Sequence, residues 1–217
     1  MSNRGSGLRT DSASVPTPAQ AELIEAAQAL ADEDGLDSVS IRRVSTRVGM
    51  RPMSVYTHVA SKDDLVARMF DQMSAEMLVP EPLPRGGREL LRLIAQRSFA
   101  TYLAHPWMLQ AFDQRPSPGP NQLRRAEQLA KAASALQLVS SRAWTAVSIV
   151  HEWTMGHALH IVTLREDKAL RSHLQSVDPS AFPFAAGALA ALETDESTFA
   201  EALEAVMDGI VGRFGAE

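Results

Sequence analysis

The 217-residue sequence contains no cysteine, and this absence removes several kinds of chemistry at once. Disulfide bonds, thiolate nucleophiles and cysteine-based zinc sites are excluded, and a reducing compartment is consistent with this composition. The sequence also has no run of about 18 apolar residues, so we expect no membrane span. Its N-terminal stretch, MSNRGSGLRTDSASVPTP, lacks the apolar core of a secretory signal peptide. We therefore expect a cytoplasmic protein.

Positive charge is also scarce, because the sequence has 21 Lys and Arg residues and 26 Asp and Glu residues, which gives a net charge of −5. An acidic chain is a mild argument against nucleic-acid binding, but salt limits charge effects to roughly 10 Å, so the local balance matters more. Between Ser38 and Lys62 the sequence has five cationic residues and no acidic one: Arg42, Arg43, Arg47, Arg51 and Lys62. This segment is a candidate DNA-binding surface.

Leu and Ala are abundant and runs of β-branched residues are few, which favours helices. The first predicted helix begins at Thr17, which forms a capping box with Gln20, and it ends at Gly35. Ser40 caps a second helix that Gly49 stops, and Pro52 opens a third helix to about residue 58. Ser61 caps a fourth helix, which carries an apolar stripe at steps of four: Leu65, Met69, Met73 and Met77.

These signals predict a helix-turn-helix domain with a connecting fourth helix over residues 17–79. An α-helix is about as wide as the major groove of B-DNA, roughly 12 Å, so the short third helix suits groove entry. Residues 1–16 are predicted to be a disordered arm. Its Arg4 and Arg9 either belong to an unstructured tail or reach the minor groove. Three prolines and two glycines in VPEPLPRGG, residues 79–87, mark the domain boundary.

The remaining residues, 80–217, are predicted to form a larger helical domain. Helices are expected over residues 88–103, 121–136, 141–164 and 195–214. The helix over 141–164 is apolar nearly all round, which indicates burial on most sides, and the last helix carries a clean apolar stripe. The predicted fold class is therefore all-α, with an N-terminal three-helix helix-turn-helix domain and a larger C-terminal domain.

Residues 19–66 resemble the DNA-binding region of the tetracycline-repressor (TetR) family without a gap. The matching residues are Ile24, Ala27, Leu30, Gly35, Val39-Ser40, Arg42, Val44, Gly49-Met50, Val55-Tyr56, His58-Val59 and Ser61-Lys62-Asp63-Asp64-Leu65. In the family, the tyrosine and the lysine at the positions of Tyr56 and Lys62 bind phosphates. The early residues of the second helix and the third helix read bases. The resemblance implies the same roles here.

We accordingly expect one set of side chains to face the groove: Arg42, Arg51, Pro52, Met53, Ser54 and Thr57. Arg42 can offer a bidentate fork to guanine O6 and N7. Tyr56, His58 and Lys62 are expected to contact phosphates, which position a protein without reading sequence. Two alternatives stay open, namely that Tyr56 is a core aromatic residue and that His58 packs inside. Arg43 and Arg47 are expected on a solvated face.

The larger domain resembles the same family more weakly, through His105-Pro106-Trp107, Gly119-Pro120-Asn121 and Trp153-Thr154-Met155-Gly156. The resemblance implies a small-molecule pocket and a homodimer formed through a four-helix bundle, here from helices 141–164 and 195–214. The candidate pocket residues are Trp107, Met108, Phe112, Trp144, His151, Trp153, Met155 and His157. Large side chains at helical spacing also suit a closed core, so that alternative remains.

Catalytic and metal-binding interpretations have little support. His151 and His157 share a predicted helix but lie on different faces, and no HExxH, Gly-rich phosphate loop or Ser-His-Asp order occurs. We expect no enzyme, cofactor or metal. The position at which the tetracycline-repressor branch has its metal-chelating histidine falls near Ala111, so a magnesium–tetracycline complex is not the expected effector. The expected function is a dimeric transcriptional regulator, most simply a repressor that a small molecule releases from a pseudopalindromic operator. The alternative is a helix-turn-helix dimer without an effector.

Overall fold

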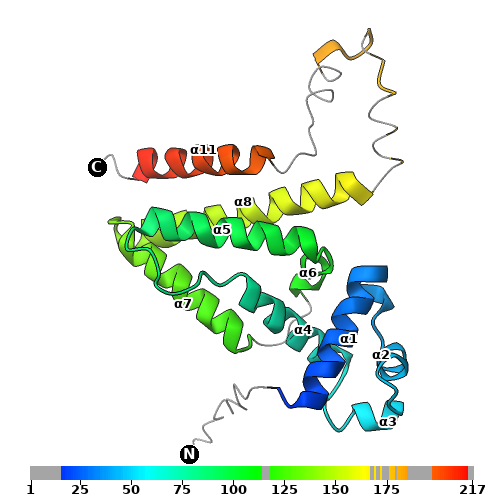
Figure 1. Ribbon diagram of the computed structural model, residues 1–217. Coiled ribbons are helices and arrows are strands. Elements are labelled where there is room, and N and C mark those ends of the chain that lie inside the picture. Colours follow the sequence, from blue (N-terminus) through cyan, green and yellow to red (C-terminus); the bar gives the residue numbers. More distant parts are fainter. Residues whose placement is uncertain are drawn as a thin grey trace, which may run out of the picture.

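A computed structural model describes residues 16–113, 118–166, 169, 172, 176–178, 180–184 and 197–214. Throughout these residues the regular structure is helical and no strand occurs, so the all-α prediction is confirmed. Figure 1 shows α1 to α3 gathered at one end, with α4 leading from them to a bundle of longer helices. The arm predicted over residues 1–16 lies, apart from its last residue, outside the described residues.

Helix α1 (Pro18–Asp34) begins and ends where the sequence predicts. The Gln20 amide donates to Thr17 Oγ1 at 3.3 Å, and the Thr17 amide donates to the Gln20 side chain at 2.9 Å, which completes the capping box. Gly35 ends the helix with a φ of 81°, a conformation that glycine adopts without strain. The short 3-10 helix η1 (Leu36–Ser38) then buries Leu36.

Helices α2 (Ile41–Arg47) and α3 (Pro52–Val55) flank a turn at Gly49, whose φ is 70°. The sequence pattern predicts that α3 extends to about residue 58, but residues 56–58 form a hydrogen-bonded turn instead. In that turn the His58 amide donates to the Val55 carbonyl oxygen at 2.9 Å. Val55 and Val59 are both buried, so they anchor α3 and its turn to the core.

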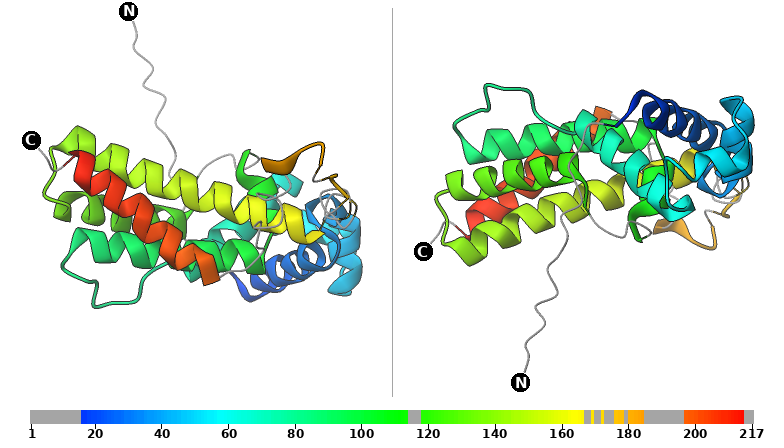
Figure 2. Two further views of the ribbon diagram at one scale, coloured as in Figure 1. Left: turned by 90° about the horizontal axis from the view of Figure 1, so that it is seen from above. Right: turned by 90° about the horizontal axis from the view of Figure 1, so that it is seen from below.

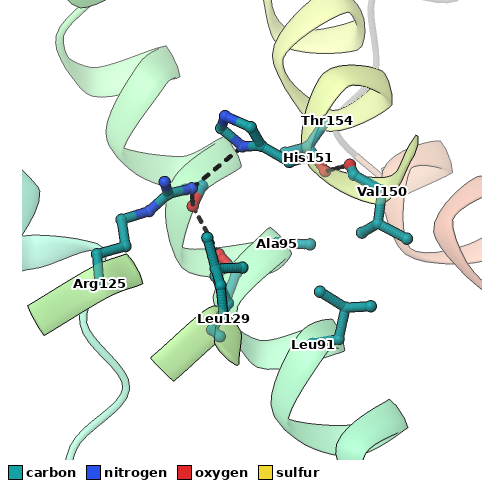
Figure 3. Close-up of a pocket in the computed structure, with 9 residues that line it drawn as sticks. Leu91, Ala95, Arg125, Leu129, Val150, His151 and Thr154 are labelled. Atoms are coloured by element: carbon teal, nitrogen blue, oxygen red, sulfur yellow. Dashed lines mark hydrogen bonds between the residues drawn. The ribbon is translucent and has the colours of Figure 1, made fainter. Parts of the chain in front are cut away.

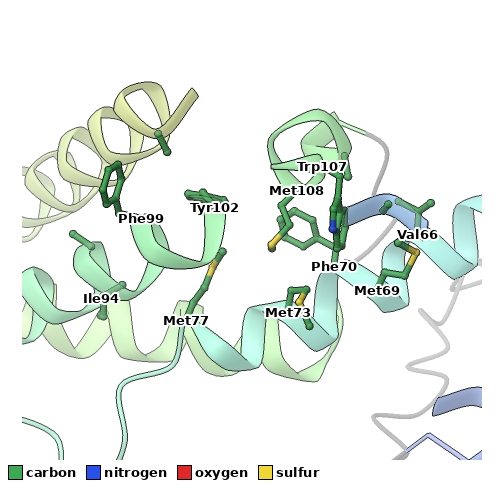
Figure 4. Close-up of a cluster of buried hydrophobic side chains, with 14 of the residues drawn as sticks. Val66, Met69, Phe70, Met73, Met77, Ile94, Phe99, Tyr102, Trp107 and Met108 are labelled. Atoms are coloured by element: carbon green, nitrogen blue, oxygen red, sulfur yellow. The ribbon is translucent and has the colours of Figure 1, made fainter. Parts of the chain in front are cut away.

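Helix α4 (Lys62–Glu76) starts at Ser61, whose Oγ accepts from the Asp64 amide at 3.0 Å. The predicted apolar stripe on this helix is buried along its whole length, together with Met77 just after it. Figure 4 shows the stripe facing Trp107 and Met108 of α6 (Trp107–Gln110), with Met77 pointing toward Tyr102 of α5 (Gly87–Ala104). Helix α4 is therefore packed into the bundle as well as into the helix-turn-helix unit.

The bundle consists mainly of α5, α7 (Pro120–Ala135), α8 (Ser140–Glu166) and α11 (Ser197–Phe214). Helix α5 packs against both α7 and α8, and α11 lies across α8 and α5 (Figure 2). A second 3-10 helix, η2 (Ala111–Asp113), follows α6. Among the described residues, no helix combines the length and apolarity that a membrane crossing requires.

Charge as well as apolar packing holds α11 to α5. Arg88 Nη2 lies 2.7 Å from Glu204 Oε2 and 2.6 Å from Asp208 Oδ1, and Arg92 Nε donates to Glu204 Oε1. The hydrogen bonds from Arg92 and Arg88 lower the pKa of Glu204 to about 2. The Glu204 carboxylate therefore stays ionised in mildly acidic solution and keeps both guanidinium groups in place.

Glu204→Gln should remove an acid-sensitive part of the stability. The folded pKa lies below the ordinary value of 4.5, so the ionised carboxylate stabilises the fold above that pH. This contribution is lost as the pH falls from about 4.5 toward about 2. We expect the thermal midpoints of wild type and variant to differ near neutral pH and to converge with acidification, measured by circular dichroism. Glu201→Gln, at an exposed position on the same helix, is the matched control. A constant gap for Glu204→Gln would contradict the assignment.

Candidate nucleic-acid interface and ligand pocket

Helix α3 presents almost all of its side chains to solvent. Residues 51–54 are exposed, with Met53 reaching 77%, and only Val55 is buried. Tyr56 is 50% exposed, so its ring lies at the surface. Gln20 Nε2 of α1 donates to the His58 carbonyl oxygen at 3.0 Å and fixes the end of the segment. The half-buried His58 thus lies against α1, next to the exposed Thr57.

The cationic residues of this region divide into two groups. Arg43 pairs with Asp34 at 2.5 Å, and Arg47 pairs with Glu33 at 2.6 Å, so α1 balances both of these charges. Among the described residues, no carboxylate oxygen lies within 4.0 Å, the limit for an ion pair, of Arg42, Arg51 or Lys62. These three lie at the starts of α2, α3 and α4, so the uncompensated positive charge borders the exposed face of α3.

A pocket lies between α5, α7 and α8 and encloses about 200 Å³, its open mouth included. Its walls are mainly apolar, with four polar side chains, and the lining residues are Leu91, Ile94, Ala95, Ser98, Arg125, Leu129, Val150, His151 and Thr154. Arg125 Nη2 donates to Ser98 Oγ at 3.0 Å and lies 3.3 Å from His151 Nδ1 (Figure 3). Much of that volume is open to solvent, so this pocket is narrow.

A second pocket of about 260 Å³ lies beside the first, toward α11. Its lining residues are Arg88, Leu91, Leu136, Leu138, Ala146, Val150, Met207 and Ile210. Apart from Arg88, every one of these side chains is apolar.

Of the eight residues predicted to bind a ligand, His151 lines the first pocket. Trp107 and Met108 lie in the core at the junction with α1 and α4, each at most 1% exposed. Phe112 is half-buried, and its ring packs edge-on against Phe70 of α4 with centroids 6.5 Å apart. Trp144 lies on the outer surface of α8, 51% exposed. Trp153, Met155 and His157 are half-buried and line neither pocket.

Both halves of the chain match known families. Residues 80–213 match the family described as tetracyclin repressor-like, C-terminal domain, and residues 23–69 match bacterial regulatory proteins, tetR family. The chain belongs to the TetR family. Members of this family are described as regulatory proteins and not as enzymes.

Two curated relatives of this TetR-family protein are similar over most of its length. The HTH-type transcriptional repressor DrrR1 of Streptomyces coeruleorubidus is 31% identical over 153 residues, which cover 70% of this chain and 57% of that protein. An HTH-type transcriptional regulator of Saccharopolyspora erythraea is 29% identical over 142 residues, 65% and 60% of the two chains. The TetR-family chain thus spans less than two thirds of either relative.

Solved structures share the fold of this TetR-family chain. A possible TetR family transcriptional regulator from Streptomyces coelicolor A3(2) has a TM-score of 0.76 at 24% identity, covering 89% of this chain and 99% of that one. ActR from Streptomyces coelicolor in complex with (S)-DNPA has a TM-score of 0.73 at 24% identity, with 92% and 100% covered. BioQ with its double-stranded DNA operator has a TM-score of 0.61 at 17% identity, with 89% and 98% covered.

The sequence pattern predicts His151 as a pocket residue but none of the other polar residues that line the first pocket. Ser98, Arg125 and Thr154 come from three different helices, so no local motif joins them. A signal for Arg125 did exist, because it precedes the inward-facing Gln128 and Leu129 by three and four positions and so shares their face of α7.

Helix α7 begins without a cap of its own, and α4 supplies one. Both Asn121 and Gln122 amides donate to Asp71 Oδ1 at 3.0 Å, and Asn121 Nδ2 donates to Asp71 Oδ2 at 3.2 Å. A Cβ at Gly119 would approach Asp71 Cγ to 2.3 Å, so only glycine leaves room for the carboxylate. Asp71 therefore satisfies α7 amides that would otherwise lack a partner, and it does so from α4.

Two further contacts join the helix-turn-helix unit to the bundle. The Val79 amide donates to Gln128 Oε1 at 3.0 Å, and Gln128 Nε2 donates to the Val79 carbonyl oxygen at 2.8 Å. Trp107 Nε1 donates to Asp32 Oδ1 of α1 at 2.8 Å, and His105 Nδ1 lies 2.8 Å from the same oxygen. Helix α7 is thus fastened to α4 through Asp71 and to Val79, just beyond the end of α4, through Gln128, and α1 is fastened to α6.

Asp71→Ala should loosen the start of α7 without unfolding the chain. We expect the unfolding free energy to fall by about 1–2 kcal/mol, the usual cost of a lost cap. Hydrogen exchange at the Asn121 and Gln122 amides should quicken, as measured by NMR. Glu25→Ala, at an exposed position in α1, is the control and should change neither quantity. If both amides stayed as protected as in wild type, the cap would not depend on Asp71.

An aromatic cluster fills the space between α5, α8 and the start of α11. Phe99 and Phe199 stack with centroids 3.8 Å apart, and Trp153 stacks on His157 at 5.1 Å. Burial, with a smaller effect of His160, lowers the pKa of His157 from its ordinary value. The neutral imidazole therefore packs as one more aromatic ring in this cluster.

No group of three or more metal-ligating side chains forms a metal site among the described residues.

Replacing His157 should change how stability depends on mild acid. Because its folded pKa lies below 6.5, the unfolded chain takes up this proton more readily, and stability falls as the pH drops below that value. His157→Phe keeps an aromatic ring but cannot titrate, so it should lose less stability between about pH 6.5 and 5. Urea unfolding at several pH values measures the difference between wild type and variant. Equal slopes in wild type and His157→Phe would refute it.

Proposed function

We propose that the protein is a dimeric repressor that binds a pseudopalindromic DNA operator and leaves it when a small molecule binds the helical bundle. The observation that carries the proposal is the exposed α3, bordered by three cations that have no carboxylate partner in the described part of the chain. Two neighbouring arginines are balanced by α1, so positive potential is concentrated where α3 could enter a major groove. Counter-charge from phosphates is the natural complement of such a surface.

The proposed base contacts come from Arg42, Arg51, Met53, Ser54 and Thr57, beside Pro52. All six are exposed, which a groove contact requires. Tyr56, Lys62 and His58 are proposed to bind phosphates. The exposed position of Tyr56 suits this role, and Lys62 stands at the first position of α4.

A second copy of the chain is the proposed partner of α8 and α11. The outer face of α8 exposes Trp144 and Leu159, each 51% exposed, which is costly for large apolar side chains in water. Gly156 of α8 and Gly209 of α11 have open space around them within the chain, so another helix could approach closely. The two α3 helices of such a dimer would have to lie about 34–36 Å apart, one turn of DNA, to bind the two half-sites of an operator.

Ligand release is proposed to run through α7. ActR has been solved with (S)-DNPA and with actinorhodin, and BioQ with its operator, so relatives of the same fold bind such partners. In this chain α7 lines the first pocket through Arg125 and Leu129. It is fastened to α4 through Asp71 and to Val79, just beyond α4, through Gln128. A ligand that widens the narrow pocket would displace α7 and, with it, α4.

Release has a thermodynamic requirement. A ligand shifts the equilibrium only by the difference between its affinities for the released and the DNA-bound conformations. Moving a population from about 1% to about 99% released requires a preference of about 10⁴-fold.

The narrowness of both pockets favours the second candidate function, a DNA-binding dimer without an effector.

Arg42→Ala and Arg43→Ala form a matched pair that tests the DNA assignment. Arg42→Ala should weaken operator binding by about tenfold or more and relax specificity at one base in each half-site, because a bidentate guanine contact contributes about 1–3 kcal/mol. Arg43→Ala removes a charge already paired with Asp34 and should cost little. Selection from random DNA followed by fluorescence anisotropy measures both effects. The same selected motif and affinity for Arg42→Ala and wild type would overturn the base contact, and an absence of any selected motif for wild type would overturn the proposed function.

A further inference from the structure

We propose that Gln20 of α1 is a positioning residue that determines how selectively α3 reads DNA. This inference rests on the proposed function, in which α3 enters the major groove. Gln20 precedes His58 by 38 positions and lies on a different element, and its Nε2 donates to the His58 carbonyl oxygen at 3.0 Å. The Gln20 side chain is half-buried in this arrangement. Its proposed action is through the backbone of the turn after α3, without a base contact of its own.

Helix α3 needs support from outside because it is only four residues long. A single helical turn is not stable by itself, since nucleating a helix is unfavourable. Within the described part of the chain, no side chain caps the start of α3, and Val55 is its one buried residue. The direction in which α3 points is therefore set by the elements around it.

The Gln20 side chain is held at both of its polar atoms. Its Oε1 accepts from the Thr17 amide at 2.9 Å, within the capping box of α1, and its Nε2 donates to His58. One planar amide carries both atoms, so the bond that fixes the acceptor also aims the donor. Glutamate would complete the same box, but an ionised carboxylate has no donor for a carbonyl oxygen. The two roles of Gln20 can therefore be separated by substitution.

The turn that Gln20 holds is joined to α3 by backbone hydrogen bonds. The His58 amide donates to the Val55 carbonyl oxygen at 2.9 Å, and the Thr57 amide donates to the Ser54 carbonyl oxygen at 3.2 Å. A shift of His58 would therefore reach Ser54 and Thr57, which are proposed base contacts. A small tilt of α3 would lose base contacts, which need donor–acceptor distances of about 2.7–3.2 Å, more readily than the charge attraction to phosphates.

Gln20→Glu tests this on the full-length chain, because it keeps the capping box, removes the donor to His58 and adds a negative charge. Fluorescence anisotropy measures its affinity for two duplexes, one with the motif that wild type selects from random DNA and one with the same bases shuffled. Repulsion of phosphates by the new charge weakens both complexes alike, so it cancels in the ratio of the two affinities. We expect this ratio to fall about tenfold, the equivalent of one lost base contact. An unchanged ratio contradicts the inference.

Two further variants separate positioning from stability. Thr17→Ala removes the Oγ1 that accepts from the Gln20 amide but leaves the bond to His58, so it should lower the thermal midpoint and keep the affinity ratio. Gln20→Lys offers a new donor to the His58 carbonyl oxygen, so it should recover part of the ratio. Equal losses in Thr17→Ala and Gln20→Glu, or no recovery in Gln20→Lys, would rule out the positioning role. If Gln20→Glu does not fold, Gln20→Met, which has no donor and adds no charge, replaces it.

The selected motif provides a second readout that a loss of stability would not produce. Random-DNA selection with Gln20→Glu should relax other positions of each half-site but keep the base that Arg42→Ala relaxes, because Arg42 lies on α2. Uniform relaxation of the whole motif would indicate a general loosening of the domain and would refute the inference.

The outcomes for Gln20 and for the proposed function are distinguishable. If wild type selects no motif, the proposed function fails and this inference fails with it. If wild type prefers its motif and Gln20→Glu prefers it to the same degree, the proposed function stands and only the role of Gln20 is refuted.

Discussion

The start of α7 is the point on which the rest of the structure depends. Its first amides have no cap in their own sequence, and an uncapped helix start inside a protein is costly. Asp71 of α4 satisfies them, Gly119 leaves the space that the carboxylate needs, and Gln128 binds Val79 just beyond the end of α4. Helix α4 therefore has a fixed position relative to the bundle. Helix α1 is held by its packing on α4 and by the Asp32–Trp107 contact, while α2 packs on α1 and α3 on α2.

The attachment of α7 to α4 connects the narrow first pocket to the helix-turn-helix unit. Arg125 and Leu129 line the first pocket from the same helix that carries Gln128. In the proposed mechanism, a ligand larger than the available space would have to move α5, α7 or α8, and a displacement of α7 would pull on Asp71 and on Val79. Close-packed interiors deform in discrete steps and do not yield gradually, so we propose that a small shift at the pocket changes the orientation of α3. Helix α11, held to α5 by Glu204, lines the second pocket through Met207 and Ile210.

Local signals allowed most of the helices to be predicted from the sequence. The Thr17–Gln20 box, the Ser40 and Ser61 caps and the glycines at 35 and 49 act over a few residues, and each is found where it was predicted. The methionine stripe of α4 is buried for the same reason, because a period of four marks one helix face. The predicted end of α3 was wrong by three residues, since the turn after Val55 depends on tertiary anchoring by Val59 and Gln20.

By itself, the sequence determined the helices, the basic character of the segment from Ser38 to Lys62 and the resemblance to one family. Only the tertiary structure decided which of those cations keep uncompensated charge, because the partners of Arg43 and Arg47 come from α1. It also decided that Trp107 and Met108 belong to the junction and Trp144 to the surface, and that Ser98, Arg125 and Thr154 meet at one wall. Helical periodicity shows which face of a helix is apolar, but which neighbour covers that face, and whether a space remains between them, depends on how separate helices pack.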